Sequence, residues 1–245
     1  MNITENNIIG ELVAEDYRTA AVFHSRGIDF CCQGNRTIKD ACAKKDLLTD
    51  ILIADLQSAI TKKTDGLVDY QSWPLDLLTD YIEKKHHRYV AEKIPVIKQY
   101  LDKVCKVHGE HHPELFEIKD EFFASANELT SHMKKEEDIL FPFVRSVYDA
   151  KQQHQTIDQR HFGTIKNPIQ MMMDEHEVEG NRFREIAALS NNYTPPQEAC
   201  NTYKVAFAML KEYEEDLHLH IHLENNIMFP KAIALENELL MCATN

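Results

Sequence analysis

The chain is poor in the residues that interrupt regular structure. Its 245 residues include 7 glycines and 8 prolines, about 3% each, against averages near 7% and 5%. Most sheet-rich folds need more turn residues than this, so the composition favours a helical protein. The length is sufficient for two domains with a buried core.

Positive charge and long apolar runs are also scarce. The 27 Lys and Arg face 40 Asp and Glu, which gives a formal net charge of -13 with no basic arm to offset it. Such a chain repels a phosphate backbone, so we expect no nucleic-acid partner. No window approaches the roughly 18 apolar residues of a membrane span, and residues 1–5 lack the start of a secretion signal. We therefore expect a cytoplasmic protein with no membrane partner.

Cysteine is too sparse and irregularly spaced for a secreted disulfide scaffold of this size. We expect reduced thiols at all six positions, which are Cys31, Cys32, Cys42, Cys105, Cys200 and Cys242.

Apolar periodicity predicts short helices over residues 1–62, a polar linker over 63–72, and a unit of long helices over 73–245. In the last unit, helical stretches are expected at roughly 73–106, 113–149, 167–191 and 196–235. Ser72-Trp73-Pro74 is typical of the start of the first. Four long helices with mostly short connections predict an up-down bundle, whose core can hold a metal site.

Histidine is the abundant residue, with 13 copies, and it occurs in an internal repeat. The pattern His-x-x-x-Glu-x-x-Ile-(Leu/Met)-Phe-Pro begins at His132 and again at His220. One helix earlier, His87 lies 45 positions before His132, and His176 lies 44 positions before His220. The bundle is therefore interpreted as a duplicated helix pair, in which each half offers two histidines and one glutamate.

The spacing within each repeat is that of metal ligands. Positions i and i+4 share one helix face, so His132 with Glu136 and His220 with Glu224 project together, and the apolar stripe around His220 directs its pair into the core. Two buried carboxylates would repel each other, and two divalent cations between them remove that cost. A nitrogen and oxygen set without thiolate favours iron or manganese over structural zinc.

A second register competes with this one, because Glu83-x-x-His86 and Glu215-x-x-His218 have the spacing of ferritin-like carboxylate sites. It leaves His176 unused. It also places His218 on a face that we expect to be solvated, together with Lys211, Glu214, His222 and Asn225. In the first helix, periodicity alone does not separate His86 from His87.

A cysteine motif, Asp29-Phe30-Cys31-Cys32-Gln33-Gly34, adds the last feature. With both His-x-x-x-Glu…Phe-Pro elements and Glu175-His176-Glu177, it makes essentially the whole chain resemble the hemerythrin-like di-iron proteins of the iron-sulphur cluster repair family, of the YtfE/ScdA type. The resemblance implies an all-α fold, with a small helical domain followed by a hemerythrin-like four-helix bundle.

The resemblance also implies a ligand set and a cofactor. It assigns the first ligand to His87, and it implies two non-haem iron ions, usually with an oxo bridge, held by His87, His132, Glu136, His176, His220 and Glu224. The chain departs from the family mainly in a longer polar connection near His154 and His161.

The function implied is repair of iron-sulphur clusters damaged by nitric oxide or peroxide, by donation of iron to the damaged proteins. Cys31 and Cys32 would act as a thiol pair that relays iron, nitric oxide or electrons. Two alternatives stay open, a di-iron enzyme that reduces nitric oxide or peroxide, and an oxygen or nitric oxide sensor. Whether the chain is an enzyme is left undecided. A homodimer is one arrangement that a flexible linker would allow.

Overall fold

The computed structural model describes residues 2–61, 68–156 and 163–243, and helices form nearly all of their regular structure. Within these ranges no strand occurs, and Ile8 and Thr37 form an isolated bridge. The predicted all-α class is confirmed. None of the described helices combines the length and apolarity that a bilayer crossing needs.

Four short helices form the N-terminal segment: α1 (Ile9–Glu15), α2 (Arg18–Ser25), α3 (Ile38–Lys45) and α4 (Thr49–Thr61). Gly27 follows α2 with φ +63°, as expected of a glycine at a helix end. The apolar pattern did not indicate α3, which carries three lysines in eight residues. Its signal is the cap, since the Thr37 side chain accepts a hydrogen bond from the Asp40 N–H.

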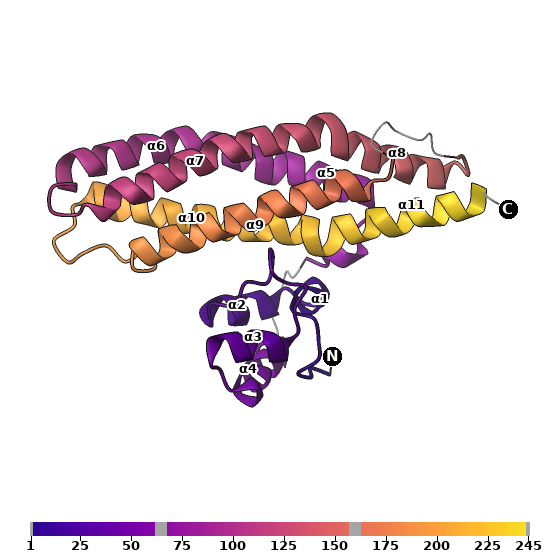
Figure 1. Cartoon of the computed structure of the whole chain (residues 1–245), viewed down its shortest axis with the longest axis horizontal. Helices are drawn as coiled ribbons and strands as arrows, with labels where there is room; N and C mark the ends of the chain where they lie inside the picture. Colours follow the sequence, from indigo (N-terminus) through magenta and orange to yellow (C-terminus); the bar gives the residue numbers. More distant parts are fainter. Residues whose placement is uncertain (1, 62–67, 157–162, 244–245) are drawn as a thin grey trace.

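Four long arms form the bundle (Figure 1). They consist of α5 (Leu75–Tyr81) with α6 (Arg88–His108), α7 (Glu114–Lys135) with α8 (Phe141–Gln152), α9 (Lys166–Leu189), and α10 (Asn201–Leu223) with α11 (Phe229–Ala243). Helix α6 packs against α7 and α10, α7 packs against α9, and α8 packs against α5 and α11. The fourth arm begins at Asn201 and not near 196, because Pro195 and Pro196 lie in the connection before it.

Three of the arms contain a π-helical turn where their two helices join: Ile82–His87, Glu136–Leu140 and Glu224–Met228. The last two precede Phe141-Pro142 and Phe229-Pro230, the ends of the repeated motif. Proline has no N–H to donate to the preceding turn, so a local change of hydrogen-bond register is favoured there. Each π-turn begins or ends at one of the predicted metal ligands.

Two apolar clusters fill the bundle, and the buried His and Glu residues lie between them in all four arms. One cluster contains buried apolar residues of α6 and α7, between Val90 and Met133, and of α9 and α10, between Phe183 and Ile221. It also includes the buried residues of the N-terminal segment. The other contains Leu75 to Ile82 and the buried residues of α8 and α11. The polar layer is therefore sealed from above and below.

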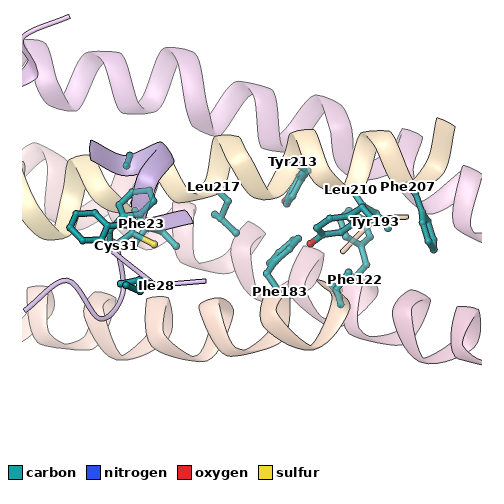
Figure 2. Packing of buried hydrophobic residues seen from close by; sticks show 14 of the residues in the cluster. Phe23, Ile28, Cys31, Phe122, Phe183, Tyr193, Phe207, Leu210, Tyr213 and Leu217 are labelled. Carbon is teal, nitrogen blue, oxygen red and sulfur yellow. The ribbon is translucent and has the colours of Figure 1, made fainter. Parts of the chain in front are cut away.

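The N-terminal helices lie against one side of the bundle, near its middle (Figure 1). Phe23, Ile28 and Cys31 pack beside Leu217 of α10 (Figure 2). The predicted linker 63–72 lies partly outside the described residues. Its last part, Tyr70–Ser72, is a 3-10 turn, and the domain boundaries at 62 and 73 stay predictions.

Candidate metal centre

The four arms bring the six predicted ligands together in two overlapping groups. Each group holds two imidazoles, and both groups contain both carboxylates. The first has His87 and His220 with Glu136 and Glu224, and the second has His132 and His176 with the same glutamates. All six residues are at most 3% exposed.

The atoms of one repeat converge on Glu136. The Nε2 atoms of His87 and His132 each lie 3.4 Å from Glu136 Oε2. Two donor atoms bound to one ion at about 2.1 Å lie about 3.0–3.5 Å apart, for ligand angles between 90° and tetrahedral. Each of the two His–Glu distances therefore fits a cation held between its two atoms, and the two histidines belong to different groups.

The other repeat also has two imidazoles around its glutamate, Glu224, but they approach different oxygens. His176 Nε2 lies 3.2 Å from Glu224 Oε2, and His220 Nε2 lies 3.1 Å from Glu224 Oε1. The pseudo-symmetry that the sequence repeat predicts is thus present in the side chains.

Three of the four imidazoles are oriented by a hydrogen bond from Nδ1. His87 donates to Glu137 at 2.8 Å, and His132 donates to Glu175 at 2.7 Å. His176 donates to the Asn225 side-chain oxygen at 2.9 Å. With Nδ1–H committed outward, each Nε2 is directed into the site, which is the arrangement that second-shell partners give to metal-binding histidines.

The Nε2 atoms of His132 and His176 lie only 3.0 Å apart. Two imidazole lone pairs repel at this distance unless a proton or a cation lies between them. The buried oxygens of Glu136, together with Glu224 Oε2, also lack hydrogen-bond partners within the described residues. Unpaired buried acceptors are costly, so the site has the charge and the open valences that divalent cations would fill.

The ionisation of these residues supports the same conclusion. Burial acts to raise the pKa of Glu224, but the His220 and His176 imidazoles hold it well below its ordinary value. Burial acts to lower the pKa of His132, whereas the Glu136 and Glu175 carboxylates raise it to about 10. The Glu136 and Glu175 carboxylates thus favour the protonated form of His132, so a proton competes with a metal ion at this imidazole.

Comparison with known proteins places this geometry in a family. The model of the Hemerythrin HHE cation binding domain matches residues 79–232, and a Domain of Unknown function (DUF542, ScdA_N) matches residues 5–60. An iron-sulfur cluster repair protein YtfE of Yersinia pestis (strain Pestoides F) is 35% identical over 229 residues, which cover 93% of this chain and 97% of that protein. The chain belongs to the iron-sulfur cluster repair family.

The similarity extends to distant members of that family. An iron-sulfur cluster repair protein ScdA of Staphylococcus haemolyticus (strain JCSC1435) is 29% identical over 229 residues, covering 94% of this chain and 99% of that protein. The match to the cation-binding domain includes all six candidate ligands. Together with the His/Glu groups, this match supports metal binding by the chain.

The competing register is not assembled. Among the described residues, neither His86 nor His218 belongs to the two His/Glu groups. The π-turn directs both His86 and His87 inward, but His86 donates from Nδ1 to Asp216 at 3.0 Å and stacks on His220. His86 therefore packs behind the candidate ligands, which explains why periodicity did not separate the two histidines.

The predicted solvated face of α10 is wrong for three of its residues, whereas Lys211 is exposed as expected. Glu214, His222 and Asn225 are 6%, 1% and 8% exposed. The N-terminal segment covers His222 and Asn225, with Phe30 packed edge-on against His218 and His222 and the Cys31 carbonyl hydrogen-bonded to Asn225. Tyr193 lies next to Glu214. Burial lowers the pKa of His222 to about 3, so its imidazole is neutral. A single helix pattern does not reveal cover supplied by a segment almost 200 residues away.

Cys31 and Cys32 lie directly over His176 in this cover. Cys32 Sγ donates to the His176 carbonyl at 3.1 Å, and the two sulphurs are 3.7 Å apart as free thiols. The hydrogen bond with Cys32, together with burial, raises the pKa of the Cys31 thiol well above its ordinary value. Cys31 is therefore held as a neutral thiol within a small group that also contains Asp29.

Sequence reasoning missed the residues that orient the imidazoles. Glu137 and Asn225 each follow the repeated glutamate directly, and each holds a histidine of the preceding arm. Their equivalent positions in the repeat were the available signal. Their different chemistry, one acid and one amide, concealed the common role.

Proposed function

We propose that His87, His132, His176, His220, Glu136 and Glu224 hold two iron ions, and that this chain repairs iron-sulfur clusters damaged by nitrosative or oxidative stress by donating iron. The observation that carries the proposal is the pair of overlapping His/Glu groups that share both carboxylates. The names of the relatives, iron-sulfur cluster repair proteins, supply the client class.

The donor set suits a cargo that must be held and then released. Bound iron would supply redox chemistry and an exchangeable cation. The chain's own residues fix the imidazoles from Nδ1, exclude water with two apolar clusters, and bring two carboxylates that bind cations only when ionised. Protonation of Glu136 or Glu224 would therefore loosen the hold on a cation.

A hollow of about 350 Å³ connects this layer with the surface between α7 and α9. It is lined by His132 and His176 at its inner end and by four carboxylates, Glu128, Asp174, Glu175 and Glu179. Lys135 also lines the hollow and pairs with Glu175, but the carboxylates outnumber it. The resulting negative charge favours cations over anions, which supports release of iron as a cation.

Cys31 and Cys32 supply the thiol part of the proposal. Cys32 Sγ donates to the His176 carbonyl and lies 3.7 Å from Cys31 Sγ, which supports our assignment of the pair to the relay of iron or electrons. The double change of Cys31 and Cys32 to serine is expected to leave the bound iron in place and to slow its transfer.

The test is transfer from the loaded protein to an apo iron-sulfur protein, with sulfide and reductant present and without oxygen. Native protein is expected to rebuild clusters and to lose its own iron in proportion. Glu136→Gln with Glu224→Gln is expected to bring no iron and to rebuild none, while Glu83→Gln, in the rejected register, is the matched control that transfers normally. Iron that stays bound while the apo-protein remains empty would contradict donation, and catalytic removal of nitric oxide or peroxide would assign an enzyme instead.

A further inference from the structure

A second, larger hollow lies on the other side of α9 and α10, away from the acidic one. Its volume is about 700 Å³, and residues of the loop after α2, the end of α3, α9 and α10 line it. It is therefore a hollow between the N-terminal segment and the bundle. Cys31 forms part of its wall.

Three cationic side chains line this hollow, in a chain whose net charge is -13. Arg184 is paired with Asp29. Lys45 forms no ion pair within the described residues, and its Nζ lies 3.6 Å from the position of a Cβ on Gly27 at the rim. Lys211 lies 4.0 Å from Glu215, with both side chains more than half exposed, and it also interacts electrostatically with Glu214. Two lysines, Lys45 at the end of α3 and Lys211 on α10, thus retain charge that a ligand can use.

The inner wall holds buried polar groups. The Tyr193 hydroxyl is buried next to the Glu214 carboxyl, and Tyr193 is 9% exposed. Glu214, beside it, is 6% exposed, and burial raises its pKa to about 7. Near neutral pH this carboxyl retains a proton in part of the molecules, so it adds less negative charge than an ordinary glutamate.

The remaining wall is apolar and includes Ile28, Phe30, Ala187 and Ala188. A volume of this size with an apolar wall and a few polar groups is typical of sites for organic ligands, whereas a phosphate ion would leave most of it unfilled. Two separated cations favour two separated anionic groups on one ligand.

We propose that this hollow binds a small organic molecule with two carboxylate groups, one directed to Lys45 and the other to Lys211. Such a ligand bridges the N-terminal segment and the bundle, with its apolar part against Phe30 and Ala187. The bound ligand lies beside Cys31, so it connects the N-terminal segment that covers the metal layer with the bundle that contains this layer. This inference does not depend on iron donation.

The test is calorimetric titration of the full-length, metal-loaded protein at low ionic strength. The probes are glutarate and S-methylglutathione, which carry two carboxylates and no free thiol, and inorganic phosphate serves for comparison. Lys45→Glu and Lys211→Glu test the site. Lys44→Glu and Lys204→Glu make the same charge change on exposed positions of the same two helices, outside the hollow.

At least one dicarboxylate is expected to bind saturably with one site per chain. Its affinity should fall about tenfold or more in Lys45→Glu and in Lys211→Glu, and by less than about twofold in the two controls. Tyr193→Phe, which keeps the ring, should weaken binding about threefold. Absence of saturable binding, an equal loss in the controls, or phosphate binding as tight as that of the dicarboxylates would overturn the proposal.

Discussion

In the first half of the bundle the residue after the ligand glutamate is Glu137, and in the second half it is Asn225. Both accept a hydrogen bond from an imidazole Nδ1–H, of His87 at 2.8 Å and of His176 at 2.9 Å. The duplicated positions thus make the same contact to their histidine. The two side chains differ in charge and in the surroundings that they meet besides the histidine.

The surroundings explain the difference. The Glu137 side chain is 42% exposed, whereas Asn225 is buried and donates from Nδ2 to the Cys31 carbonyl at 3.2 Å. An ionised carboxylate has no proton to donate to that carbonyl, so an amide is required there. Two positions later Ile139 is 46% exposed and Ile227 only 1%. The second half is therefore the one built to carry the cysteine segment.

The largest expected effect comes from making the second half resemble the first. Asn225→Asp replaces the donor to the Cys31 carbonyl with a buried carboxylate, which we expect to lower the free energy of unfolding by about 3 kcal/mol. The cysteine segment should loosen, so Cys32 should react faster with a thiol reagent. Urea unfolding and labelling rates measure the two effects.

The reciprocal change is the control for this substitution. Glu137→Gln removes a charge at an exposed position, where the change in stability is expected to stay below about 1 kcal/mol, with Cys32 reactivity unchanged. Equal losses of stability in the two variants would show that the halves do not differ in the way described.

A smaller effect is expected where the cysteine segment touches α9. A Cβ on Gly180 would lie 2.8 Å from Cys32 Sγ, so Gly180→Val should displace that side chain and destabilise the protein by about 1–3 kcal/mol. Ala91, four residues after His87 as Gly180 follows His176, is exposed. Ala91→Val should therefore be nearly neutral in unfolding and in Cys32 labelling, and a comparable loss there would remove the steric explanation.

The smallest expected effect concerns pH and the covered face of α10. Because burial raises the pKa of Glu214 to about 7, the folded chain holds a proton that the unfolded chain releases near its ordinary pKa of 4.5. The free energy of unfolding should therefore fall as pH rises from about 5 to 8, with Glu214 contributing about 1–2 kcal/mol. Glu214→Gln should remove this part of the slope, while Glu117→Gln, at an exposed position of α7, should retain it.

Much of this structure follows from the sequence, because its determinants are periodic and local. Long apolar stripes predict the four arms, and the spacing of His132 with Glu136 and of His220 with Glu224 predicts their inward direction. The repeat also predicts that His87 and His176 are equivalent. These features depend on helix geometry alone.

Other features depend on contacts between distant segments and were not predicted. The π-turns direct both His86 and His87 inward, so helical periodicity does not apply there. Residues 30–32 shield His222 and Asn225 from solvent, and no sequence pattern within α10 predicts this contact. Likewise, the space at Gly180 of α9 is occupied by Cys32, a side chain almost 150 residues earlier in the sequence.

The most direct test of the shared-carboxylate centre is the metal content of protein purified without oxygen, determined with its absorption spectrum for the native chain and for Glu136→Ala with Glu224→Ala. The account predicts about two irons per chain in the native protein and almost none in the double variant, because both ions depend on both glutamates. Substoichiometric metal in the native chain, or full metal content in the double variant, would contradict it.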